Sequence, residues 1–89
     1  SAVVNAAVTY QLLYTYNQHP EVFSDLVDFY GKKQPNGIPD IIDEAKWGLD
    51  WLSKVNYKTE SPVVTGKLAA TFALASDVLK NFFPELSTA

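Results

Sequence analysis

The 89-residue chain is long enough for one domain at most, and a composition that is 47% hydrophobic and 13% aromatic excludes a disordered protein. Its net charge of -3 argues against nucleic acid and anionic membranes as partners, because both bind a basic face. The chain has no Cys, which excludes disulfides, thiolate nucleophiles and Cys-ligated metal sites.

The first segment, residues 2–17, contains no charged residue and is apolar or neutral around its whole circumference. A membrane span is one explanation, but the segment is too short and has too many amide and hydroxyl side chains for that. We therefore expect a buried helix over residues 2–17, in which Asn5, Thr9 and Gln11 need internal hydrogen-bond partners. Pro20 ends this helix, because proline disfavours the helical conformation of the residue before it.

The next segment, residues 21–30, predicts a short helix or turn. Its apolar side comprises Val22, Phe23, Leu26, Phe29 and Tyr30. His19, the only histidine, precedes it at a helix end, where a side chain more often caps main-chain carbonyls than shuttles protons. Because one histidine without cysteine gives little support for a metal site, the sequence predicts no metal ligand.

The sharpest local signal in the chain is the start of the following helix. Asn36-Gly37 is a turn signal, and Pro39 suits the first helical position, where its missing N–H group is not needed. Three acidic residues follow in or near the first turn, where the helix dipole favours negative charge. They are Asp40, Asp43 and Glu44. The pattern predicts a helix over residues 38–55.

This central helix is apolar on two faces. One stripe at helical spacing comprises Ile38, Ile41, Ile42, Ala45, Leu49, Leu52 and Val55. Trp47 and Trp51, four residues apart, lie on a different face. The sector expected to face water is narrow and comprises Asp43, Lys46, Asp50 and Lys54. We therefore expect neighbours on two sides of this helix.

The last predicted helix covers residues 65–82, after a loop over residues 56–62. Thr65 is the expected N-cap, and Pro84 ends the helix. Its buried stripe comprises Leu68, Phe72, Ala75 and Leu79. The sequence thus predicts an all-α protein with three long helices and one short helix or turn. These helices are too apolar to be buried among themselves, which indicates a part of a larger helical architecture.

Two pairs of residues are candidates for carbohydrate chemistry. Asp40 and Glu44 are four apart on a helix, so their Cβ atoms would lie about 5–6 Å from each other, and glycoside hydrolysis uses paired carboxylates near that spacing. Acids at a helix start more commonly serve the helix dipole, and that interpretation is favoured here. Trp47 and Trp51 could stack on sugars, but two aromatics at helical spacing more often belong to a core.

A third candidate is the adjacent pair Tyr57 and Lys58, in the loop after the tryptophan helix. Ligand contacts concentrate on such loops, although a solvated loop is the simpler interpretation. The chain contains neither a Gly-rich phosphate loop nor a Gly-x-Ser-x-Gly nucleophile elbow. No cofactor is therefore predicted.

Residues 36–52, Asn-Gly-Ile-Pro-Asp-Ile-Ile-Asp-Glu-Ala-Lys-Trp-Gly-Leu-Asp-Trp-Leu, resemble the hallmark helix of glycoside hydrolase family 9, the endoglucanase and cellulase family. Residues 3–8, Leu12-Leu13 and residues 17–23 resemble the helix that directly follows the catalytic aspartate motif of that family. Residues 68–76 resemble its next inner helix. The three matches together cover most of the chain.

This resemblance implies that residues 1–89 are a helical segment of an (α/α)6 toroid, from the N-terminal half of a secreted or periplasmic enzyme. The enzyme would hydrolyse β-1,4-glucan by inversion in an open cleft. The two catalytic aspartates of the family would precede Ser1, and its general-acid glutamate and substrate-binding histidine would follow Ala89. No catalytic residue is therefore expected within the chain, which would supply scaffold. Tyr57 and Lys58 match the Tyr-His-Lys that opens a cleft-forming excursion, so they are the expected substrate-binding residues.

The competing hypothesis is a non-catalytic helical interaction module that buries its apolar faces against a partner chain. The open reading frame on either side of the segment separates the two hypotheses. A module would have a start codon near Ser1 and a stop codon near Ala89, whereas a hydrolase would continue in both directions.

Overall fold

The computed structural model describes residues 2–55 and 60–84. Its elements are α1 (Ala2–Gln18), the 3-10 helix η1 (Pro20–Val22), α2 (Asp40–Leu52) and α3 (Pro62–Leu79). Every regular element in these two ranges is helical, which confirms the predicted all-α class and its three long helices.

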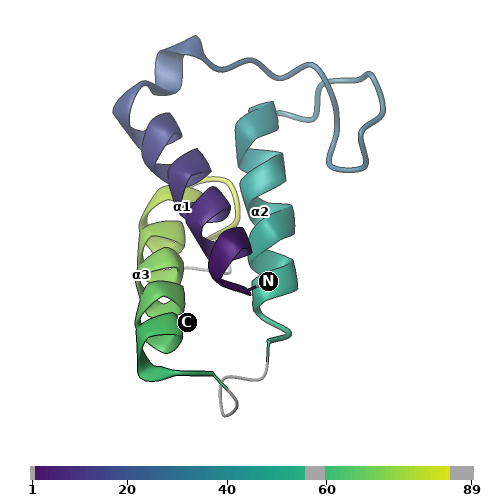
Figure 1. Cartoon of the computed structure of the whole chain (residues 1–89). Coiled ribbons are helices and arrows are strands. Elements are labelled where there is room, and N and C mark those ends of the chain that lie inside the picture. Colours follow the sequence, from purple (N-terminus) through teal and green to yellow (C-terminus); the bar gives the residue numbers. More distant parts are fainter. Residues whose placement is uncertain (1, 56–59, 85–89) are drawn as a thin grey trace.

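The three helices alternate in direction, and α1 lies against both of the others (Figure 1). Contacts between α2 and α3 are far fewer, so α1 is the central element of the packing. The start of α1, the end of α2 and the start of α3 lie at one end of the molecule. The loop that connects α1 to α2 lies at the opposite end (Figure 1).

The core is made of the predicted stripes. One buried cluster comprises Leu13, Ile42, Ala45, Leu49, Ala75, Val78 and Leu79. A second comprises Ala6, Leu52 and Leu68. At Gly48 the backbone of α2 approaches α1 so closely that an added Cβ would collide with the Thr9 hydroxyl. That hydroxyl donates to Asn5 Oδ1 at 3.0 Å, which satisfies a buried polar group within α1.

The predicted start of α2 is wrong by two residues and its end by three. Pro39 is the N-cap rather than a helical residue, with an extended ψ of 143°. Its carbonyl accepts from the amides of Ile42 and Asp43, so the helix begins at Asp40. After Leu52 the chain continues in tight turns, in which the amide of Val55 donates to the Leu52 carbonyl at 3.1 Å.

The predicted N-cap of α3 is also wrong. Ser61, not Thr65, caps the helix, and its hydroxyl accepts from the Val64 amide at 3.3 Å. Pro62 then occupies the first turn, where it needs no donor. The helix ends at Leu79, whose carbonyl accepts from the amides of two phenylalanines, Phe82 and Phe83. The helix therefore stops before Pro84 rather than because of it.

Residues 21–30, predicted as a short helix or turn, begin in the single turn of η1 and continue without regular structure. Residues 23–39 have no regular structure. We name them the aspartate loop, because Asp25 and Asp28 within it and Asp40 directly after it accept hydrogen bonds from its main-chain amides. Gly31 and Gly37 have φ of 85° and 83°, which non-glycine residues rarely adopt. The turn at Gly31 directly follows residues 21–30, and the turn at Gly37 lies shortly before α2.

Much apolar surface of α1 and of both tryptophans remains exposed, in line with the expectation that these helices cannot be buried among themselves. Only Ala6, Thr9 and Leu13 of α1 are buried, and Gln11 is exposed. Trp47 and Trp51 are 60% and 43% exposed. The described chain therefore does not enclose them, and their place in the core of a larger helical body stays a prediction. The other exposed large apolar side chains include Val4, Val8, Tyr14 and Val63.

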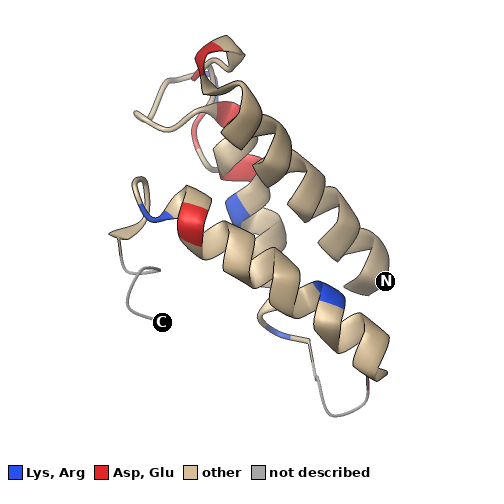
Figure 2. Cartoon of the chain, turned by 90° about the vertical axis from the view of Figure 1, so that its left-hand side faces the viewer, with Lys and Arg blue, Asp and Glu red and all other residues tan. Residues whose placement is uncertain are grey.

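Charge is distributed unevenly over the molecule. Figure 2 shows α1 without charged residues along its whole length and acidic residues gathered where α1 ends and α2 begins. By length and composition α3 could cross a membrane, a test that the core helix of a soluble protein also passes. A site that binds polar groups is therefore expected at the end of the molecule where α1 ends and α2 begins.

Candidate functional site

Two aspartates fasten the aspartate loop to the start of α2. The Asp40 carboxylate accepts from the amides of Leu26 and Val27, both at 3.0 Å. The Asp25 carboxylate accepts from the amides of Asn36, at 3.1 Å, and Gly37, at 2.6 Å. These bonds supply partners to loop amides that no helix or strand satisfies.

A third aspartate closes a smaller turn inside the loop. Asp28 accepts from the amides of Tyr30 and Lys32 and, at 2.6 Å, from Gln34 Nε2. The hydrogen bond from Gln34 is the largest cause of a lowered pKa for Asp28, and the two amides lower it further against the opposing effect of desolvation. All of these donors favour the ionised form of the carboxyl group.

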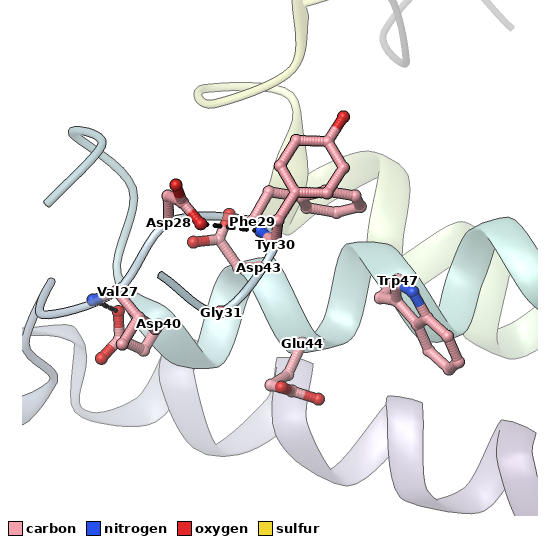
Figure 3. A pocket seen from close by; sticks show the side chains of 9 residues that line it. All are labelled: Val27, Asp28, Phe29, Tyr30, Gly31, Asp40, Asp43, Glu44 and Trp47. Atoms are coloured by element: carbon pink, nitrogen blue, oxygen red, sulfur yellow. Dashed lines mark hydrogen bonds between the residues drawn. The ribbon is translucent and has the colours of Figure 1, made fainter. Parts of the chain in front are cut away.

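Between the aspartate loop and α2 lies a hollow of about 490 Å³, which we name the acidic hollow. It is lined by Val27, Asp28, Phe29, Tyr30, Gly31, Asp40, Asp43, Glu44 and Trp47. Figure 3 shows Asp40 and Trp47 at its two ends along α2, with Tyr30 and Phe29 on the loop. Its lining contains four carboxylates and three aromatic rings but no basic residue.

Asp43 is the least hydrated carboxylate of the hollow. Sequence reasoning placed it in the sector facing water, but the aspartate loop covers it and leaves it 5% exposed. Its Oδ2 accepts from Asn36 Nδ2 at 3.0 Å, whereas its Oδ1 is buried without a hydrogen-bond partner among the described residues. Burial is the main cause of a raised pKa for Asp43; the hydrogen bond from Asn36 opposes it, and neighbouring aspartates add to it.

Glu44 and Trp47 complete the hollow from the exposed side of α2. Glu44 is exposed and has no hydrogen-bond or ion-pair partner in the part of the chain that the structure describes. Asp40 differs from Glu44 in that its carboxylate accepts from two loop amides, an interaction that sequence reasoning did not anticipate beside the helix dipole. The two carboxylates therefore have different surroundings, and the absence of a catalytic residue from the chain stays a prediction.

The remaining candidates give a mixed result. Tyr57 and Lys58 lie outside the described residues, so their substrate-binding role stays a prediction. The His19 side chain makes no capping hydrogen bond, and its Nδ1 lies 3.8 Å from Glu21 Oε1, so the predicted carbonyl cap is wrong. Among the described residues no group of three or more His, Asp and Glu side chains is placed to hold a metal ion.

Sequence reasoning missed the contribution of Asp28 to a site. The segment that contains it offered no sign of a cleft, because the hollow forms only when residues 27–31 fold back over α2. The usable signal was the combination of aspartates with two glycines in a long connection, since aspartate side chains bind main-chain amides in turns.

Comparison of the chain with family models, with curated proteins and with solved structures found no match. The chemistry of the site is therefore judged from its groups alone. Its lining side chains offer mainly hydrogen-bond acceptors and aromatic faces, so it favours ligands rich in donors or positive charge.

Proposed function

We propose that the chain is part of the catalytic domain of a glycoside hydrolase of the family 9 type, which cleaves β-1,4-glucan by inversion. The observation that carries the proposal is residues 36–52, whose sequence resembles the hallmark helix of that family. In this proposal the chain provides scaffold helices, and the general base and general acid belong to other parts of the same protein.

The position of the helix ends is consistent with this role. The start of α1 lies at the same end as the end of α2 and the start of α3. A catalytic motif preceding α1 and the segment that joins α2 to α3 would then contribute to one face. The acidic hollow lies at the opposite end, so its carboxylates are not candidates for the hydrolytic pair.

The exposed apolar side chains support a position inside a larger helical body. Val4 and Val8 on α1, Val63 on α3 and the two tryptophans of α2 are all more than two-fifths exposed. Further helices of a toroid would cover such surface. The same observation favours the second candidate function, a non-catalytic module that buries these side chains against a partner chain.

Activity of the full-length gene product decides between the two candidates. An inverting β-glucanase has to release α-anomeric products from carboxymethylcellulose or cello-oligosaccharides, which proton NMR detects during the first minutes of reaction. The 89-residue chain assayed alongside it should show no turnover, because an inverting site needs two carboxyl groups about 6.5–9.5 Å apart on either side of the bond.

Two matched variants of the full-length protein sharpen this test. Asp40→Asn and Glu44→Gln should both retain hydrolysis, since neither side chain is assigned to the reaction. Turnover by the short chain that is abolished by Glu44→Gln would overturn the proposal. A full-length product without glucanase activity that forms a stable complex with another chain would favour the interaction module.

A further inference from the structure

We propose that one exposed face of α2 is an interface between two copies of the chain, packed with their α2 helices antiparallel. We name it the tryptophan face, and it comprises Glu44, Trp47, Trp51 and Lys54. The proposal rests on the interaction-module candidate, for which it names a second copy as the partner, and it makes no use of the glucanase assignment. Three features carry it: exposed aromatic surface, two opposite charges and the symmetry of their spacing.

The four residues share a face because of their helical spacing. At about 100° per residue, their positions fall within about 80° of the helix circumference. Lys54 lies just after the end of α2, but its amide donates to the Trp51 carbonyl at 3.1 Å, so the chain keeps winding up to this residue. Figure 3 shows Glu44 and Trp47 projecting from the opposite side of α2 to Asp43. The aspartate loop that covers Asp43 therefore leaves this side of the helix open.

The first feature is the exposure of the two tryptophans. Trp47 is 60% exposed and Trp51 is 43% exposed, so together they present the equivalent of about one whole tryptophan side chain to water. Burying this surface in both copies would remove roughly 400 Å² from water, since an aromatic side chain buries about 150–250 Å². Because a standard interface buries about 1,200–2,000 Å², we expect a weak dimer.

The second feature is a pair of opposite charges. Glu44 and Lys54 are exposed, and neither forms a hydrogen bond or ion pair within the described part of the chain. The other charges nearby on α2 are engaged, Asp50 with Lys46 at 2.7 Å and Asp40 with the aspartate loop. Ten residues of helix separate Glu44 from Lys54 by about 15 Å, which is too far for them to pair with each other. A partner that carries the same two charges in reverse order would satisfy both.

The third feature is the symmetry of the spacing about Leu49. Glu44 and Lys54 each lie five residues from it, and Trp47 and Trp51 each lie two residues from it. A two-fold interface requires that a residue contacting a second residue is contacted by it in return. An antiparallel copy aligned at Leu49 meets this requirement, because Glu44 then faces Lys54 of the second copy and Trp47 faces its Trp51. A parallel copy would instead bring like charges together, so the face is complementary only to its own reverse.

Sedimentation velocity of the 89-residue chain tests the proposal. Between about 10 µM and about 1 mM we expect a monomer–dimer equilibrium with a Kd of roughly 100 µM. The chain has two tryptophans, so both indole N–H signals in NMR spectra report on the face. Both should shift over the concentration range in which the dimer forms, whereas the amide signal of Gly66 on α3 should not.

Truncation of one tryptophan tests the aromatic contribution. Trp47→Ala should weaken dimerisation at least tenfold, because tryptophans dominate interfaces and each dimer contains the residue twice. Val63→Ala on α3 is the matched control, since Val63 is also exposed, at 68%, but lies on a different helix. It should leave the Kd unchanged.

Charge reversal tests the register. Glu44→Lys and Lys54→Glu should each weaken dimerisation about tenfold, since each turns two attractive pairs into two repulsive ones. Glu44→Lys makes the chain less negative, so net charge alone predicts the opposite change. An equimolar mixture of the two variants should associate again as a heterodimer, because every facing pair then joins opposite charges. Lys67→Glu on α3 is the control for the altered charge and should leave the Kd unchanged.

The proposal is overturned by a chain that stays monomeric to about 1 mM, or by a dimer that Trp47→Ala does not weaken. A mixture of the Glu44→Lys and Lys54→Glu variants that remains monomeric excludes the antiparallel arrangement and overturns it equally. Circular dichroism of each variant establishes that the helices are retained. None of these results bears on hydrolysis by the full-length product, so failure of this proposal and failure of the glucanase assignment are distinguishable.

Discussion

Both halves of α2 pack into the apolar core, the first through Ile42, but only the first half is also held by carboxylate hydrogen bonds. Its first turn, with Asp40 and Asp43, is joined to the aspartate loop by carboxylate hydrogen bonds and carries a buried charge. Its second half packs on α1 and α3 through small and apolar side chains, with Gly48 allowing close approach of α1. One short helix therefore contains a polar attachment and an apolar one.

This difference in interactions predicts how each half of α2 responds to substitution and to pH. Apolar packing depends on the shape and volume of the side chains and is not directly altered by protonation, so damage to it should lower the stability of the whole chain. Carboxylate bonds to an exposed loop depend on ionisation and on local geometry. Damage to them should open the loop and leave the helices in place.

The largest effect is expected from Leu13→Ala. Leu13 is fully buried in the larger core cluster, so its truncation removes apolar contacts and leaves a cavity. The free energy of unfolding should fall by about 2–5 kcal/mol. Urea denaturation followed by circular dichroism measures it. Val8→Ala on the same helix is the control, since Val8 is 53% exposed, and it should cost about 0.5 kcal/mol or less. Equal losses would mean that the described core is not the one that stabilises the chain.

Gly48→Ala should have the next largest effect, because the new Cβ would collide with the Thr9 hydroxyl. Overpacking of this kind costs about 1–3 kcal/mol. Gly66→Ala is the matched control on α3, where nothing lies within 4 Å of the added Cβ. It should instead stabilise the helix by about 0.5–1 kcal/mol. The double variant Thr9→Ala with Gly48→Ala should be less unstable than the sum of its parts; strict additivity would contradict the close approach.

The helices and their buried stripes could be predicted from the sequence because helical periodicity is a local property. Residues three and four apart share a face whatever surrounds the helix, and this placed Ile42, Leu49 and Leu79 correctly in the core. The ends were predicted less well. Pro39 suited the first helical position and Thr65 suited an N-cap, whereas the main-chain angles make Pro39 and Ser61 the N-caps.

The candidate site could not be predicted because its bonds join residues far apart in the chain. Asp40 binds an amide 14 residues earlier, and Asp25 binds amides 11 and 12 residues later. No periodic pattern encodes such pairs. The burial of Asp43 follows from the loop that covers it, so its helical position alone suggested a residue facing water. The exposed tryptophans have the opposite explanation, since side-chain type favours a core but the described chain offers no neighbour to cover them.

Asp40→Asn should have a smaller and local effect. The asparagine Oδ1 can still accept both loop amides, but the negative charge and the 3.2 Å bond from the Leu26 amide to Oδ2 are lost. About 1 kcal/mol of a partly exposed, charge-assisted interaction should therefore be lost. Hydrogen exchange at the amides of Leu26 and Val27 should accelerate, whereas exchange within α1 should not. Asp50→Asn is the control, because it removes only the 2.7 Å ion pair with Lys46. Faster exchange in the loop of that control would contradict a specific role for Asp40.

The smallest effect concerns pH and distinguishes Asp43 from Asp28, whose pKa values shift in opposite directions from the ordinary 3.8. The raised pKa of Asp43 means that the folded chain binds its proton more tightly, so its contribution to stability should increase as pH falls through that raised value. The lowered pKa of Asp28 gives a contribution that is present above pH 3.8 and is lost as pH falls through the lowered value. The charges of three other aspartates, Asp25, Asp40 and Asp28, add to the raised pKa of Asp43, of which burial is the main cause. Thermal unfolding between pH 3 and 7 should therefore show an increase in stability on mild acidification followed by a decrease.

Two variants separate these contributions. Asp43→Asn should raise the unfolding midpoint near pH 7 and flatten the increase on mild acidification, while Asp28→Asn should flatten only the decrease at lower pH. If the increase in stability on mild acidification persists in Asp43→Asn, a different group causes it, and the buried Asp43 carboxylate does not influence the stability of the α2 start.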